Sequence, residues 1–180
     1  MTQTIELIPL NCIRCSTPIP AEVDEVAWIC RTCGTGMTLT DSAELIPCEF
    51  HFSADLSPGQ RGSPFWVAEG KVRLMRESYN AIGKSDREAE AFWSQPRLFC
   101  IPAYSCGLEE MLTVGTRLLT NPPPLIRGAA TDFLPITHSA ADFRPFAEFL
   151  IIALEAARRD KVKTVRFELE LQAPTLWVLP

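Results

Sequence analysis

Alternating apolar and polar positions predict β-strands in much of the chain. In residues 65–76, apolar side chains alternate with Glu, Lys and Arg, which predicts a strand with one buried face. Residues 165–171 alternate in the same way, and the short apolar run of residues 98–103 predicts a more central strand. Residues 176–179 are all apolar, so we expect this last strand either to lie centrally in a sheet or to dock on another chain.

Helical spacing of apolar residues predicts two main helices. The first begins after Ser105 and is amphipathic. The second begins at Ser139 or Asp142 and runs to about Arg159, with apolar side chains around much of its circumference. A helix of this kind must be covered on nearly all sides, by the sheet and the first helix or by a partner. Residues 85–93 are expected to form a further, short helix with a solvated face.

The strongest chemical signal is a set of cysteines. Two C-x2-C pairs are separated by fourteen residues and comprise Cys12, Cys15, Cys30 and Cys33. Four thiolates at this spacing form the tetrahedral cage that Zn²⁺ prefers. Gly34, directly after the second pair, is expected to adopt the positive φ that lets the turn reverse. We therefore expect one structural zinc ion bound by these four cysteines.

The cysteine spacing resembles that of a zinc ribbon over residues 10–40. The resemblance implies two metal-binding turns, called knuckles, with one strand at residues 27–29 and another at residues 37–40. We expect Trp28 to pack beneath the knuckles. Zinc ribbons occur in transcription factors, ribosomal proteins, helicases and adaptors, so the resemblance implies a closed structural site and does not select a process.

Other uses of the four thiols are less well supported by the sequence. Iron in a rubredoxin-like site would use the same sulfur cage, but Ser16 stands where such a site usually has Gly, and the pairs are closer together than usual. Neither cysteine pair has the strand-to-helix setting of a thioredoxin-like redox motif. Arg14 and Arg31 lie within the knuckles, where we expect them to offset thiolate charge.

Three cysteines and both histidines lie outside this motif. Cys48 and His51 have ligand-like spacing, and with Cys100 and Cys106 they could form a second metal site if the segments met in space. The simpler interpretation is that Cys48 and Cys100 are small buried apolar residues. Cys106 precedes a predicted helix, so a nucleophilic pair with His138 is a further alternative.

Composition and charge divide the chain. It has 180 residues, of which 22% are charged, and a net charge of −5. Residues 1–55 contain eight acidic residues and only two arginines, whereas Ser, Pro and Gly dominate residues 56–64. We therefore expect an acidic zinc-ribbon module in residues 1–55, a linker or long loop in residues 56–64, and an α+β domain in residues 65–180.

Several classes of protein are disfavoured by the same observations. The longest apolar run, residues 149–154, is far too short to span a membrane, and the N-terminus lacks the features of a signal peptide. We expect a cytoplasmic location. The acidic ribbon lacks the clustered Lys and Arg that bind phosphates, so binding to nucleic acid is not expected.

The sequence as a whole predicts an N-terminal zinc ribbon followed by a small sheet of four or more strands with two main helices. The expected function is that of a non-catalytic, zinc-binding adaptor or accessory subunit. It would bind another protein, or a second copy of itself, through the apolar helix and strand near the C-terminus. One alternative is a nucleic-acid-associated ribbon protein of transcription or replication, and a weaker one is an enzyme that uses Cys100 or Cys106.

Overall fold

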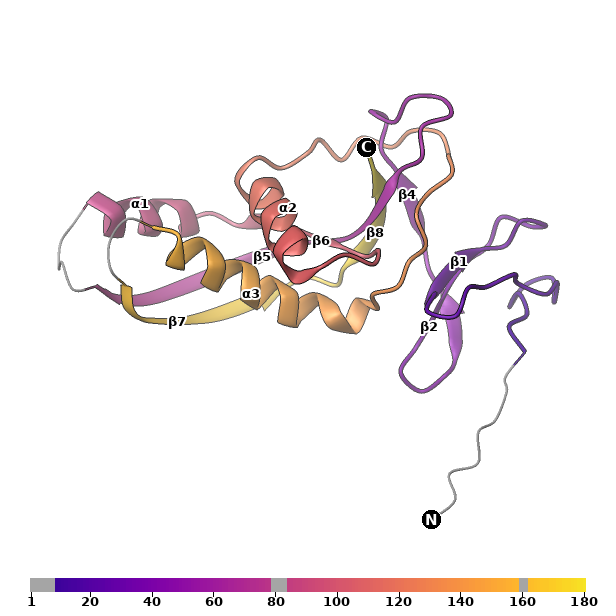
Figure 1. Ribbon diagram of the computed structural model, residues 1–180, viewed down its shortest axis with the longest axis horizontal. Coiled ribbons are helices and arrows are strands. Elements are labelled where there is room, and N and C mark those ends of the chain that lie inside the picture. The colour runs from indigo at the N-terminus through magenta and orange to yellow at the C-terminus, as the bar shows by residue number, and fades with distance from the viewer. Residues whose placement is uncertain (1–8, 79–83, 159–161) are drawn as a thin grey trace, which may run out of the picture.

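The structure is a computed structural model that describes residues 9–78, 84–158 and 162–180. Its smaller sheet is antiparallel and contains β1 (Ala27–Ile29), β2 (Gly36–Leu39) and β3 (Leu45–Pro47) in that order. This sheet and the two knuckles lie at one end of the molecule, and we call them the ribbon (Figure 1). The larger sheet and the helices form the remainder, which we call the body.

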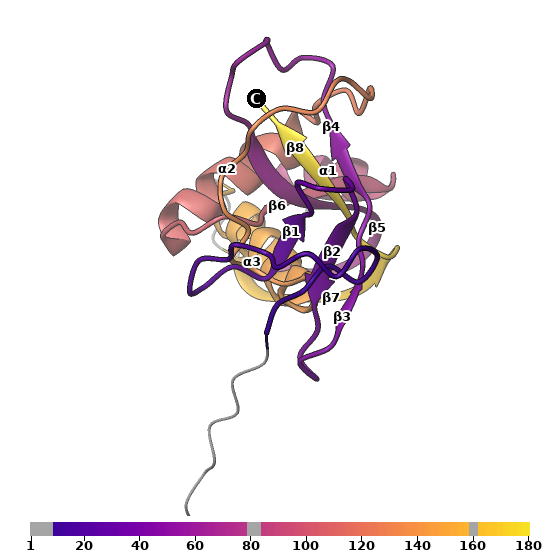
Figure 2. The same ribbon diagram turned by 90° about the vertical axis from the view of Figure 1, so that its right-hand side faces the viewer.

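The larger sheet is built around one long strand. This strand, β5 (Ser63–Ser78), pairs with β6 (Arg97–Pro102) along one edge. Along its other edge it pairs first with β8 (Thr175–Leu179) and then with β7 (Val162–Leu171), all antiparallel. The short strand β4 (Phe50–Phe52) lies parallel to β8 on its far side (Figure 2). β8 is therefore an internal strand, between β4 and β5.

Three α-helices accompany this sheet in the described part of the chain: α1 (Lys84–Trp93), α2 (Leu108–Thr120) and α3 (Phe143–Ala156). A short 3-10 helix, η1 (Ala140–Asp142), leads into α3. Ser139 caps η1 in a reciprocal arrangement: its hydroxyl accepts from the Ala141 N–H, and its own N–H donates to the Asp142 carboxylate at 2.8 Å. Arg159, the expected end of the second helix, lies outside the described residues.

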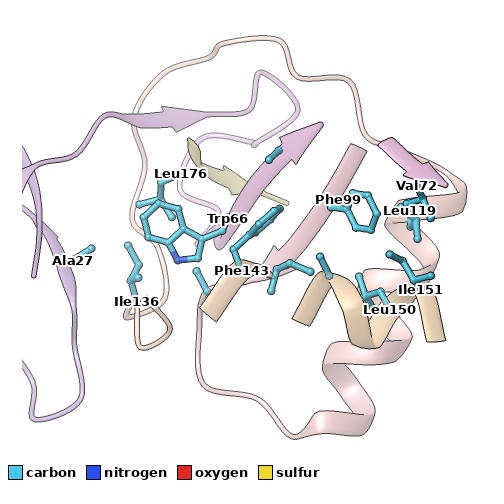
Figure 3. Packing of buried hydrophobic residues seen from close by; sticks show 14 of the residues in the cluster. Ala27, Trp66, Val72, Phe99, Leu119, Ile136, Phe143, Leu150, Ile151 and Leu176 are labelled. Carbon is cyan, nitrogen blue, oxygen red and sulfur yellow. The ribbon is translucent and has the colours of Figure 1, made fainter. Parts of the chain in front are cut away.

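The main core lies between α3 and one face of the sheet. Leu150 and Ile151 of α3 are fully buried and pack in the same cluster as Trp66 of β5 and Phe99 of β6 (Figure 3). A second cluster on the opposite face contains Phe65, Val67, Cys100, Trp177 and Leu179, with side chains of α2 packed against it. Odd and even positions of β5 face different layers, so residues 65–68 are all apolar where both clusters cover the strand. Alternation with charged residues begins at Glu69, where the odd-numbered positions become exposed.

The segment between α2 and η1, residues 121–139, ties the parts together by backbone hydrogen bonds. The N–H of Gly128 donates to the Phe52 carbonyl of β4, and the N–H of Gly62, just before β5, donates to the Asp132 carbonyl. The N–H of Val26, just before β1, donates to the Ile136 carbonyl at 2.8 Å. This connecting segment therefore contacts both the body and the ribbon.

The α+β class is confirmed, and so are the expected strands and main helices. Of the two alternatives for residues 176–179, the central strand is confirmed: their side chains are buried and both edges of β8 are paired within the chain. The other alternative, that this strand docks on a partner, is wrong. The division at residues 56–64 stays a prediction, although β4 pairs with the body and β5 begins at Ser63. No helix in the described ranges is both long and apolar enough to cross a lipid bilayer.

Candidate metal centre

The four cysteines of the two pairs meet at one point of the ribbon. Their sulfur atoms all lie within 4.8 Å of one another. The Sγ atoms of Cys12 and Cys33 are 3.5 Å apart, and those of Cys15 and Cys30 are 3.6 Å apart. Tetrahedral coordination with Zn–S bonds of about 2.3 Å requires sulfur separations of roughly 3.8 Å. No disulfide joins them. The cysteines are therefore positioned to bind a metal ion.

Both knuckles use the same backbone turn. In the first, the Ser16 N–H donates to the Cys12 carbonyl at 2.9 Å, and in the second the Gly34 N–H donates to the Cys30 carbonyl at 2.8 Å. Ser16 and Gly34 occupy equivalent positions and have φ angles of 59° and 72°. The positive φ expected at Gly34 is therefore present, and Ser16 adopts the same left-handed conformation without being glycine.

A threonine stands beside one sulfur in each knuckle. The Oγ1 atom of Thr17 lies 3.2 Å from Cys15 Sγ, and that of Thr35 lies 3.3 Å from Cys33 Sγ. These hydrogen bonds lower the pKa of Cys15 and lower that of Cys33 to about 6, whereas burial raises the pKa of Cys12 to about 11. The thiolate is the form that binds metal, so the two threonines favour binding.

The role of these threonines was not predicted from the sequence, although the sequence contains a signal for it. Each C-x2-C pair is followed by one small residue and then by Thr, in CIRCST and in CRTCGT. The repeat of Thr two positions after each second cysteine could have identified both residues as partners of the sulfurs.

The metal centre and the core of the ribbon are continuous. Trp28 and Met37 are buried with Cys12 and Cys30 in one small cluster. Trp28 also donates its indole N–H to the Glu25 carboxylate at 2.9 Å. The expected position of Trp28 beneath the knuckles is confirmed. Because two of the four buried residues are cysteines of the site, much of the ribbon's packing depends on the metal centre.

The proposed second metal site does not form among the described residues. There, no group of three or more potential ligands occurs apart from the four ribbon cysteines. Cys48 packs against the main core, and burial together with the Glu49 carboxylate raises its pKa to about 11. His51 is buried against the Trp177 ring, with 4.9 Å between ring centroids. Cys100 is fully buried, which raises its pKa to about 12.

Cys106 and His138 show no sign of mutual activation. Burial and the nearby Glu110 raise the pKa of Cys106, whereas an activated nucleophile requires a lowered one. The Nδ1 atom of His138 lies 3.0 Å from the Pro102 carbonyl oxygen, and its ring packs on Phe146. Both histidine contacts are those of a residue that holds the connecting segment on the body.

Fold and site together define a four-cysteine metal-binding module joined to an α+β body. Comparison of the chain with protein-family models, with curated proteins and with solved structures finds no match.

Proposed function

We propose that the protein is a zinc-binding, non-catalytic adaptor or accessory subunit whose ribbon binds another protein in a cytoplasmic, multi-subunit assembly. The cluster of Cys12, Cys15, Cys30 and Cys33 supports the metal part of this proposal, because four thiolates fill the coordination sphere of one structural Zn²⁺. A metal enclosed in this way has no open position for a substrate. Binding in such sites contributes about 10–16 kcal/mol to folding, so the zinc would hold the ribbon in shape.

Exposed apolar side chains on the ribbon support the choice of a protein partner. Val23 is fully exposed and Ile13, within the first knuckle, is 42% exposed. Residues 19–25, which include Val23, border two grooves where the ribbon meets the body. Their volumes are about 700 and 590 Å³. Exposed apolar residues beside grooves are typical of surfaces that bind proteins.

The charge of the ribbon argues against nucleic acid as the partner. The first 55 positions contain no lysine and only two arginines, Arg14 and Arg31. Zn²⁺ with four thiolates carries a charge of −2, which adds to the excess of acidic side chains. Phosphate recognition requires the opposite sign of potential.

The first experiment is native mass spectrometry of the protein purified from its own cells without added metal. We expect one zinc ion per chain and a retained partner protein. Cys30→Ser should lose the metal, whereas Cys106→Ser, at a cysteine outside the cluster, should keep it. Metal retained at full stoichiometry in Cys30→Ser would overturn the four-ligand assignment.

The partner surface is tested in the same preparation with Val23→Asp. This variant should keep its zinc and lose the partner. Met75→Asp is the matched control, because Met75 is an exposed apolar residue of the body, 45% exposed. A zinc-loaded protein that retains no protein partner, or that binds RNA or DNA with micromolar or tighter affinity, would overturn the adaptor proposal.

A further inference from the structure

The outer edge of β7 is open. Among the described strands only β5 pairs with β7, and Figure 1 shows β7 along the border of the larger sheet. The strand spans ten residues, so its open edge is long. An unpaired edge of this length is a template for pairing with another strand.

The pairing with β5 shows which backbone groups face this open edge. The N–H of Gln172 donates to the Glu69 carbonyl at 3.0 Å, in register with the β5–β7 ladder. Hydrogen-bonded pairs alternate in an antiparallel ladder, so the even-numbered residues of β7 bond to β5 and the odd-numbered ones face outward. Arg144 of α3 confirms this direction, because its guanidinium donates to the Leu169 carbonyl at 3.3 Å.

Apolar side chains lie incompletely covered along the same edge. Val165, Phe167 and Leu169 are only half-buried. One side of α3 lies above the edge of β7, because Arg144 on that side bonds to the Leu169 carbonyl. The same side carries Glu148 and Ile152, which follow Arg144 at intervals of four residues. Ile152 is 47% exposed there. The α3 helix of a second copy, placed across this edge, would cover the side chain of Ile152.

The charges of β7 are complementary to a second copy of β7. Antiparallel pairing about a two-fold axis through Phe167 places Arg166 directly opposite Glu168 of the other copy, twice in each dimer. In the described ranges Arg166 makes no ion pair with an acidic side chain, and the one ion pair of Glu168 is with the exposed Arg73 at 3.5 Å. Moving the axis to Arg166 would place Arg166 opposite itself. Moving it to Glu168 would place Arg166 opposite Glu170 but would also set Glu168 against itself, so the register centred on Phe167 is the one with opposite charges and no like-charge pair.

The backbone fits the same register. With the axis at Phe167, the outward N–H and C=O groups of Phe167 pair with those of Phe167 in the second copy, and Val165 pairs with Leu169. The Leu169 carbonyl, which accepts a solvent-exposed hydrogen bond from Arg144, would instead accept one from a backbone N–H of the second copy. We propose that the protein forms a two-fold dimer in which β7 pairs with β7 of a second copy and joins the two larger sheets. This proposal does not depend on the metal centre or on the proposed function.

Sedimentation equilibrium over a range of concentrations tests the dimer with a charge-swap series. The wild type should be a reversible dimer. Arg166→Glu and Glu168→Arg should each raise the dissociation constant by about tenfold or more, because each sets like charges opposite one another at two places. The double variant Arg166→Glu/Glu168→Arg should restore the wild-type constant to within a few-fold.

Arg117→Glu is the matched control, because Arg117 is an exposed residue of α2, which packs on β6 at the opposite edge of the sheet from β7. It should leave the dissociation constant unchanged. Circular dichroism checks that each variant is folded. A wild type that stays monomeric at the highest soluble concentration, or a dimer that is insensitive to both reversals, would overturn the proposal. A double variant that fails to recover would overturn the register.

Discussion

The contact between α2 and α3 is so close that adding one methyl group should change the stability of the body. At Gly115 of α2, an added Cβ atom would lie 2.7 and 2.8 Å from the two terminal methyl groups of Leu150 on α3. Leu150 is fully buried, so its side chain has little room to move. Gly115→Ala therefore has two opposite effects on stability: a gain in helix propensity and a steric clash.

The size of each effect follows from the contact. Replacing Gly by Ala inside a helix is worth about 1 kcal/mol, and overpacking a core costs about 1–3 kcal/mol. We expect Gly115→Ala to lower the free energy of unfolding by about 1 kcal/mol in the wild type. In a Leu150→Ala background, which by itself should cost about 2–5 kcal/mol, the clashing atoms are gone and the propensity gain remains. There, Gly115→Ala should raise the free energy of unfolding by about 1 kcal/mol.

The change of sign between the two backgrounds is the measured quantity. Urea denaturation followed by circular dichroism at 222 nm reports on the body, because all three described α-helices belong to it. Thr113→Ala, at an exposed position of α2, is the control and should show the same small gain in both backgrounds. If Gly115→Ala has the same effect with and without Leu150, the close packing of the two helices is refuted.

Three further predictions concern the body. Trp93→Phe removes the indole N–H that donates to buried Glu155 at 2.8 Å, and urea denaturation should show a loss of about 1–3 kcal/mol. Burial lowers the pKa of His51 below its usual 6.5, with Glu49 opposing and Arg127 adding to the shift. The unfolded chain then binds more protons than the folded one, so stability should fall as the pH drops below 6.5. Urea titrations at several pH values should show a smaller fall in His51→Phe. Deleting residues 175–180 removes internal β8 and should abolish cooperative thermal unfolding; a cooperatively folded truncation would contradict this.

The periodicity of apolar residues predicted those strands and helices in which the pattern repeats several times. The alternation in β5 and β7 and the helical spacing in α2 and α3 each extend over at least two turns or several residue pairs. Two elements were not predicted, β3 and β4, which have three residues each. β4 exists because it pairs with β8, which is distant in the sequence. No local pattern contains that information.

The metal centre shows the same division between local and distant information. The cysteine spacing was sufficient to predict the four-ligand cluster, because each knuckle is a local turn. The positions of Cys48 and His51 depend on tertiary packing: one packs in the main core and the other against Trp177. The ligand-like spacing of these two residues therefore had no counterpart in space.

The parallel pairing of β4 with β8 constrains how the protein folds while it is being synthesised. The outermost ribbon cysteines, Cys12 and Cys33, are 21 residues apart, so the knuckles can close on a metal soon after they leave the ribosome. β4 has no strand to pair with until β8 has been made, since Phe50 pairs with Leu176. Until then, Phe50 and Phe52 lack the strand that holds them in the sheet. During the interval between the synthesis of these two strands, we therefore expect the new chain to expose apolar surface that favours aggregation.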